Sequence, residues 1–271
     1  MTELCKEVTD LNTQKTNGGF LKYMPLLREL VVRDIKIRYR HSVLGILWTV
    51  LSPLLNMIVM TVVFQTIFAN TIEYFALYVM IGNIVFGFVS ESTNRGMNAI
   101  LWNASLIKKV YIPKYLFPLA NVVSSLVNFG FSFIAMIFVM LIIRAPFRPM
   151  MLTFIVPLIY LMVFAFGLSL VLCAINVFFR DIQHLYTVFL TVWMYISAIF
   201  YDASMLGNGF VKTIIDVNPL YQYIRFFREI IMYGTFPGYV HNLYCAGWAV
   251  LMLIIGVLFF KSTQKKFILH I

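Results

Sequence analysis

The sequence has 271 residues, of which 61% are hydrophobic and 12% charged, with a net charge of +10 and a mean hydropathy of +0.87. Ordinary soluble domains carry about a quarter charged residues, so the composition excludes that class and predicts an all-α polytopic membrane protein. The basic residues lie between long apolar runs. In that position they can contact anionic lipid headgroups and determine which side of the membrane each loop occupies, so nucleic-acid binding is not expected.

The first segment, residues 1–25, is a polar tail without the basic start and apolar core of a cleaved signal peptide. Residues 26–271 show no internal repeat or linker and are expected to form one transmembrane domain. The stretch from Leu26 to Arg40 carries apolar residues on one helical face and charged residues on another. This pattern predicts an amphipathic helix on the membrane surface, either as a plain anchor or as a contact surface.

Six charge-free stretches follow, and a helix needs about 20 apolar residues to cross the hydrocarbon layer. No alternating pattern suggests a barrel, so these stretches predict six transmembrane helices. The stretches run from His41 to Ile72, Tyr74 to Ser90, Tyr115 to Ile143, Pro149 to Phe179, Ile182 to Tyr201 and His241 to Phe260.

The basic residues predict the orientation of these six helices. If the N-terminus is cytoplasmic, 16 of the 21 Lys and Arg residues lie on the cytoplasmic side. Cytoplasmic loops carry the excess of Lys and Arg in membrane proteins. Both termini are therefore expected in the cytoplasm.

Two connecting segments are too apolar for free loops. Between Asn103 and Pro118, apolar residues alternate with lysines ahead of Pro113, which predicts a short surface helix that contacts another protein. The segment from Asp202 to Val240 is rich in aromatic residues, and it is expected to re-enter the outer leaflet as helices between spans five and six.

The chain carries no recognisable chemistry of its own. No phosphate-binding loop occurs, and the three cysteines and four histidines are scattered, so we expect no catalytic, cofactor or metal site. Transporters driven by ion gradients bury ionisable groups in their spans. Here Glu91 and Arg95 come nearest, and their spacing predicts that they pair with each other. Any energy for transport must come from a partner.

Four motifs, in order and with the expected spans between them, resemble the membrane subunits of type-2 export ABC transporters. Within that family they are most similar to the branch that exports lipid-linked polysaccharides such as O-antigen, capsule or teichoic acid. The motifs are Arg33 to Arg40 with Ser42-Val43-Leu44-Gly45, Leu47-Trp48 and Ser52-Pro53-Leu54; Asn103 with Leu106 to Pro113 and Pro118; Phe178 to Ile182; and Asn218-Pro219-Leu220 with Arg228.

The resemblance implies a homodimer in the bacterial plasma membrane that pairs with two copies of an ATPase subunit, which bind Mg-ATP. The implied cargo is a lipid-linked glycan. The implied ATPase interface comprises Arg33, Asp34, Arg38, Leu106, Lys109, Val110, Tyr111, Ile112, Pro113, Arg180 and Asp181, and the outer gate comprises Asn218, Pro219, Tyr221 and Arg228. The family often has prolines where this chain has Ala198 to Asp202, and no fused carbohydrate-binding module is visible.

The aromatic residues suit a sugar cargo, because pyranose rings stack on aromatic faces. Spans one and five of each protomer are implied to form the channel. Its candidate residues are Trp48, Tyr186, Phe189, Trp193, Ser197 and Phe200. The alternative is that these aromatics simply face lipid at the membrane interface.

Two other functions remain open. The same architecture could export a drug, a lipid or a peptide. A non-transporting scaffold or a lipid-modifying enzyme is disfavoured by the ordered motifs and by the lack of buried catalytic residues.

Overall fold

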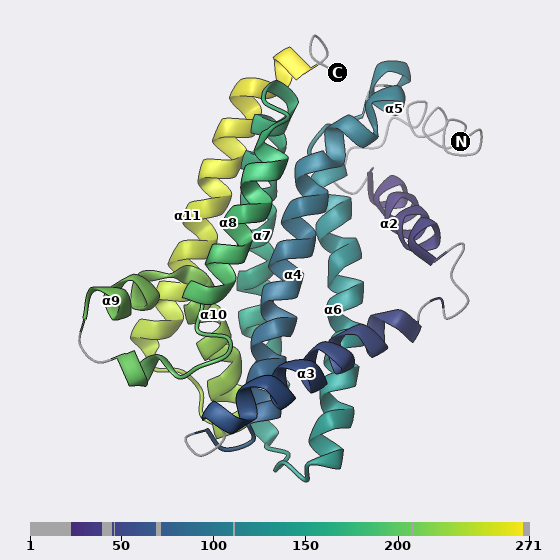
Figure 1. The fold of residues 1–271 in the computed structure, drawn as a ribbon. Coiled ribbons are helices and arrows are strands. Elements are labelled where there is room, and N and C mark those ends of the chain that lie inside the picture. Colours follow the sequence, from purple (N-terminus) through teal and green to yellow (C-terminus); the bar gives the residue numbers. More distant parts are fainter. Residues whose placement is uncertain are drawn as a thin grey trace.

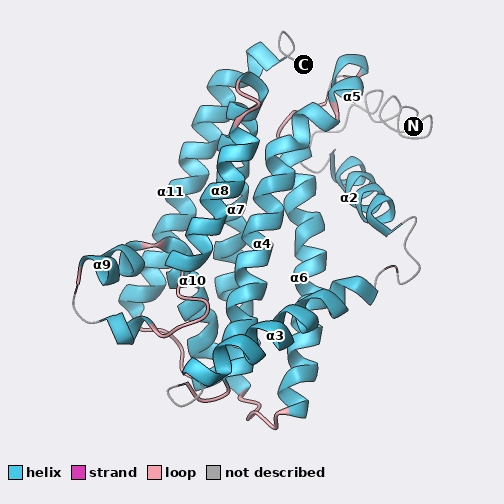
Figure 2. Ribbon diagram, in the orientation of Figure 1, coloured by secondary structure: helices cyan, strands magenta, loops and turns pink. Residues whose placement is uncertain are grey.

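The computed structural model of the chain describes residues 23–39, 45, 47–68, 72–110, 112–206 and 209–267. Within these ranges the protein is helical and contains no β-strand (Figure 2). Four segments are long and apolar enough to cross a membrane: Phe75–Trp102, Leu116–Ile142, Pro149–Phe178 and Tyr239–Lys266.

The core of the fold is a bundle of four long helices (Figure 1). These are α4 (Phe75–Trp102), α6 (Leu116–Ile142), α7 (Ile155–Phe178) and α11 (Tyr239–Thr263). The 3₁₀ segment η2 (Pro149–Phe154) leads directly into α7. In length and composition these four segments agree with four of the six predicted spans.

Two shorter apolar helices, α3 and α8, accompany the bundle. α3 (Leu47–Phe68) crosses α4 and α6 obliquely, and α8 (Ile182–Ile196) runs beside α7 (Figure 1). At 1.5 Å per residue, the 15 residues of α8 span only about 22 Å, short of the hydrocarbon thickness.

Short elements occupy the two ends of the bundle. α2 (Met24–Tyr39) lies against α6, and α5 (Ala104–Lys109) caps the end where α4 finishes. The opposite end carries α9 (Phe210–Val217), α10 (Pro219–Arg228) and the π-helical turn η4 (Glu229–Tyr233). We call these the α5 end and the α10 end.

Two expected boundaries were wrong. The second charge-free stretch stopped at Ser90, whereas α4 continues through Glu91 and Arg95 to Trp102. The fifth stretch ran to Tyr201, whereas α8 finishes at Ile196. In both cases side chains from other helices, described below, decide the boundary.

The closest helix packing in the bundle joins α7 and α11 through two glycines. A Cβ on Gly167 would lie 2.5 Å from the backbone of Met252, and a Cβ on Gly256 would overlap the backbone of Gly167. Small residues let transmembrane helices approach closely enough for van der Waals contacts to hold them together.

We therefore expect Gly256→Ala to force α7 and α11 apart and to cost about 1–3 kcal/mol, the usual penalty of overpacking. Thermal unfolding of the purified protein in detergent measures the loss. Gly247→Ala is the matched control, because a Cβ at Gly247 in the same helix meets nothing within 4 Å. Equal midpoints for the two variants would contradict the assigned contact.

Candidate functional site

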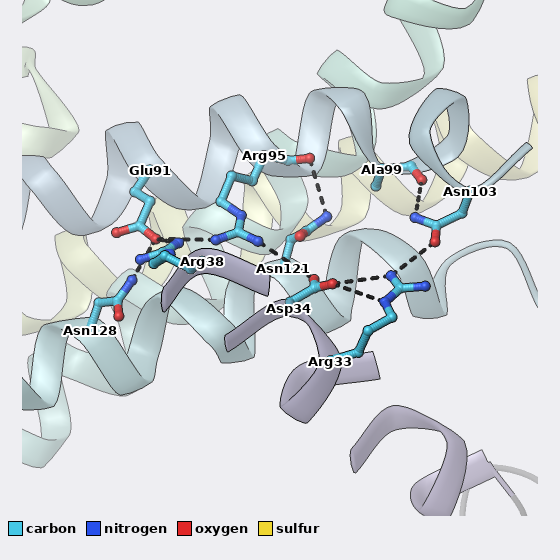
Figure 3. Close-up of polar contacts among 9 residues, drawn as sticks. All are labelled: Arg33, Asp34, Arg38, Glu91, Arg95, Ala99, Asn103, Asn121 and Asn128. Atoms are coloured by element: carbon cyan, nitrogen blue, oxygen red, sulfur yellow. Dashed lines mark hydrogen bonds and ion pairs between the residues drawn. The ribbon is translucent and has the colours of Figure 1, made fainter. Parts of the chain in front are cut away.

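An ion-pair network joins α2 to α4 along the side of the bundle (Figure 3). The carboxylate of Glu91 pairs with the guanidinium of Arg38, and it also accepts a hydrogen bond of 2.7 Å from Asn128 on α6. Arg95, one turn further along α4, lies 3.8 Å from the same carboxylate. The predicted pairing of Glu91 with Arg95 is confirmed, and α2 supplies a closer partner.

Asp34 forms the second half of this network. Its carboxylate lies 3.1 Å from Arg33 and 3.7 Å from Arg95. Burial raises the pKa of the Asp34 carboxyl above its usual value, against the opposing charges of Arg33 and Arg38. Arg33 donates in turn to the Asn103 side chain at 2.9 Å, which ties α2 to the junction of α4 and α5.

The charged residues of α2 that the resemblance assigned to the ATPase interface thus face the bundle. Arg33, Asp34 and Arg38 all make their observed polar contacts within the chain (Figure 3). The exposed residues of α2 are others: Met24, Pro25, Arg28, Glu29, Lys36 and Ile37.

The short helix α5 exposes a different side from the one predicted. Leu106, Ile107 and Ile112 were expected to be an exposed contact surface, but they are buried. They belong to one apolar cluster with Leu26 and Leu30 of α2. The helix also ends at Lys109, before Pro113, with Val110 half-buried at its C-cap.

The outward surface at the α5 end consists of other residues. Lys108 and Lys109 are exposed on α5, and Trp102 at the end of α4 is 64% exposed. Between α7 and α8, Arg180 and Asp181 are exposed as expected for a contact loop. Tyr111, Arg40 and the stretch 42–44 lie outside the described residues.

The aromatic residues predicted on span five do form a row on α8. Ring centroids lie 6.0 Å apart between Tyr186 and Phe189 and 5.2 Å apart between Phe189 and Trp193. Tyr186 is buried and donates to Thr93 of α4 at 2.7 Å, whereas Phe189 is 50% exposed. Trp48, the candidate from span one, lies on α3 beside a cavity described below.

Asn218 fastens the far end of α8 to α10. It accepts a 2.8 Å hydrogen bond from the indole of Trp193 and donates to Ser197 at 3.0 Å. The same side chain caps α10 by accepting from the backbone of Leu220, while Pro219 occupies the first turn. Ser197 is completely buried, so this contact places it inside the protein.

Arg228 explains why α8 stops at Ile196. Ala198 adopts a left-handed conformation with φ of 47°, which costs a non-glycine residue about 1 kcal/mol. The buried guanidinium of Arg228 donates to the carbonyl oxygens of Ala198 and Ile199 at 3.1 Å each. It also lies 3.3 Å from the ring centroid of Tyr78. An arginine from α10 thus secures a helix end where the family often has prolines.

The remaining gate and channel residues lie in the interior nearby. Tyr221 on α10 packs beside the small apolar cluster that contains Ala198 and Ile215. Phe200 is buried in the main core. Among the described residues, the α8 row therefore exposes only part of its predicted channel set, chiefly Phe189.

Several residues at these sites were not predicted from the sequence. Asn103 and Asn128 were missed as partners of the network, and Trp102 was missed as a surface residue. The available signal was polar residues recurring at helical spacing in apolar runs, as with Ser125 and Asn128 on α6.

We expect Arg228→Gln to lower stability by more than about 2 kcal/mol, because the carbonyl oxygens of Tyr78, Ala198 and Ile199 lose their donor at about 1–3 kcal/mol each. Thermal unfolding in detergent measures the change. The control is Arg225→Gln on the same helix, whose exposed pair with Glu229 contributes about 0–1 kcal/mol. Similar midpoints for both variants would show that Arg228 does not secure the end of α8.

Known proteins are similar to this chain in sequence over most of its length. Residues 25–232 match the family model described as ABC-2 type transporter. The chain is 31% identical to the O-antigen export system permease protein RfbA of Myxococcus xanthus, over 91% of this chain and 95% of the relative. It is 28% identical to RfbA of Klebsiella pneumoniae, over 93% and 96%.

A more distant relative is the polysialic acid transport protein KpsM of Escherichia coli, 23% identical over 92% of this chain and 97% of the relative. The relatives are named as permease or transport components, and four helices here are apolar and long enough to span a bilayer. The chain is an integral membrane protein that belongs to the ABC-2 type transporter family.

Proposed function

We propose that this chain is the permease subunit of an ATP-driven exporter that moves a lipid-linked polysaccharide from the cytoplasmic to the outer side of the bacterial plasma membrane. The observation that carries the proposal is the similarity to O-antigen export permeases over more than nine-tenths of both chains. The absence of a nucleotide-binding motif in the sequence agrees with an ATPase on a separate subunit.

The α5 end is the proposed docking surface for two ATPase subunits. Trp102, Lys108 and Lys109 are exposed together with Arg180 and Asp181, although the surrounding sequence is strongly apolar. An exposed tryptophan beside charged side chains has the composition of a protein contact. In this proposal the α5 end lies in the cytoplasm, with both termini on that side.

The proposed transport unit is a dimer with six membrane helices per protomer, in which α3 and the shorter α8 complete the membrane domain. Both helices carry rows of exposed apolar residues: Leu55, Ile58, Val59, Val62 and Val63 on α3, and Leu185, Val188, Phe189, Val192 and Tyr195 on α8. A second protomer would cover part of these rows, and the glycan would pass between them. The α9–α10 segment would close the outer end.

The docking surface is tested by reversing its charge. We expect Lys108→Glu with Lys109→Glu to abolish surface glycan and ATPase co-purification, because both side chains are exposed and support no internal contact described here. Lys212→Glu, on α9 at the opposite end, should leave both unchanged. Normal export by the double variant would refute the docking role, and failure of the unaltered chain to bind any ATPase would refute the proposed function.

The glycan path is tested at Phe189. We expect Phe189→Ala to reduce export two- to tenfold, corresponding to the loss of about 0.5–1.5 kcal/mol of aromatic stacking. Val192→Ala is the control, because Val192 lies on the same helix and both side chains are 50% exposed. The amount of surface glycan, normalised to the amount of permease, is the measurement. An equal loss in both variants would contradict a stacking role.

A further inference from the structure

A cavity lies between α3, α4 and α6, away from the α8 row. Its volume is about 560 Å³, within the range of small-molecule sites. On α4 its wall runs from Met80 to Glu91, a rise of about 16 Å at 1.5 Å per residue. Trp48 and Phe129 form aromatic parts of the cavity wall, and Arg38 of α2 lies at the same end as Glu91.

Two polar rows face this cavity from opposite helices. Both rows have the same i, i+3, i+7 spacing, which places their members on one helical face. The rows are Thr49, Ser52 and Asn56 on α3, and Ser125, Asn128 and Ser132 on α6. Hydroxyl and amide groups are uncommon in a chain this apolar. Where they converge on one cavity, they are expected either to bind a ligand or to hydrogen-bond with one another.

Mutual pairing does not account for the whole arrangement. Polar side chains that hold transmembrane helices together hydrogen-bond across the interface. Here the Ser125 side chain is fully buried in the cavity wall, and its hydroxyl has no hydrogen-bond partner among the described residues. A buried hydroxyl without a partner costs about 1–3 kcal/mol, and a hydrogen-bonding ligand in the cavity removes that cost.

Arg38 and Glu91 are the charged residues at one end of the cavity, and they belong to a larger network whose charge favours an anion. The network of Figure 3 contains three guanidinium groups, from Arg33, Arg38 and Arg95, but only two carboxylates, from Asp34 and Glu91. The described network thus has a surplus of one positive charge in a partly buried site. In addition, the Nε atom of Arg95 is buried and has no hydrogen-bond partner within the part of the chain that the structure describes.

We propose that the cavity between α3, α4 and α6 binds the phosphate-bearing, hydroxylated headgroup of a lipid. The phosphate would replace Glu91 at the guanidinium of Arg38, while Glu91 keeps its hydrogen bond from Asn128 and its proximity to Arg95. Arginine is well suited to this role, because its planar donors bind phosphate in pairs. The headgroup hydroxyls would contact the two polar rows.

The hydrocarbon part of such a ligand has a place to lie. Leu55, Ile58 and Val59 of α3 are exposed apolar residues next to the row that ends at Asn56. Two sources supply this headgroup chemistry: the phosphate-linked sugar of the exported cargo, or a bilayer phospholipid such as phosphatidylglycerol. The first source rests on the proposed function, and the second is independent of it.

Binding is measured on the purified full chain in neutral detergent, without ATPase or export. The probes are a polyprenyl phosphate sugar, phosphatidylglycerol and phosphatidylcholine, titrated by native mass spectrometry. We expect at least one anionic probe to bind more tightly than phosphatidylcholine. Binding of the polyprenyl probe alone assigns the site to cargo, and binding of phosphatidylglycerol alone assigns it to bilayer lipid; either result supports the cavity as a headgroup site.

Three variants distinguish binding in this cavity from non-specific attraction of an anionic lipid to a basic protein. Arg38→Gln should weaken the anionic probe at least tenfold, whereas Lys36→Gln, an exposed lysine on the same helix, should not. Glu91→Gln should strengthen binding several-fold, because it removes the anion that competes for Arg38. A purely structural role for the Arg38–Glu91 pair gives no reason for such a gain.

Ser125→Ala covers the case in which Arg38→Gln does not yield monodisperse protein. Removing an unpartnered hydroxyl does not endanger folding, and it should weaken the probe measurably. The proposal is overturned if no anionic probe is preferred, or if Arg38→Gln and Lys36→Gln, or Ser125→Ala and the unaltered chain, bind alike. Such a result would leave ATP-driven glycan export untouched, since that function is tested by ATPase association and surface glycan.

Discussion

The pairing of partly buried charges between α2 and α4 is the constraint on which the rest of the structure depends. An unpaired charge in such a site is unfavourable, so charged residues on a bundle helix fix the position of whatever neutralises them. Glu91 and Arg95 sit within α4, and their partners Arg38 and Asp34 come from α2. Satisfying them presses α2 against α4 and α6. The apolar side of α2 then covers α5, and α3 begins beside Arg38, at one end of the cavity.

The surfaces available for function follow from this arrangement by elimination. Once Leu106 and Ile112 are covered by the apolar cluster around α2, the α5 end presents lysines and Trp102 to a partner. α8 is anchored through polar contacts at Tyr186 and Trp193, and much of its apolar length stays exposed. A helix held by a few hydrogen bonds and left open on one side is consistent with the proposed path between two protomers. The short helix α8 is thus both firmly attached to its neighbours and exposed along one side.

The sequence predicts the membrane-spanning class, the four long helices and the existence of α2 and α5, because these depend on local apolar periodicity. It does not predict what depends on distant partners. Cutting the chain at charged residues ended the second span at Ser90, since neither Arg38 nor Asp34 could be foreseen as neutralising Glu91 and Arg95. Likewise, a six-residue helix offers too little pattern to tell its covered side from its exposed side, so the contact surface of α5 was assigned to residues that are buried.

The end of α8 has a consequence for how its length is determined. The carbonyl groups of Ala198 and Ile199 accept hydrogen bonds from the side chain of Arg228, about thirty residues later in the chain. A proline would end the helix through its own covalent structure, whatever the neighbouring helices do. Here the end of α8 depends instead on a side chain from another helix. The length of α8 is therefore tied to the position of α10.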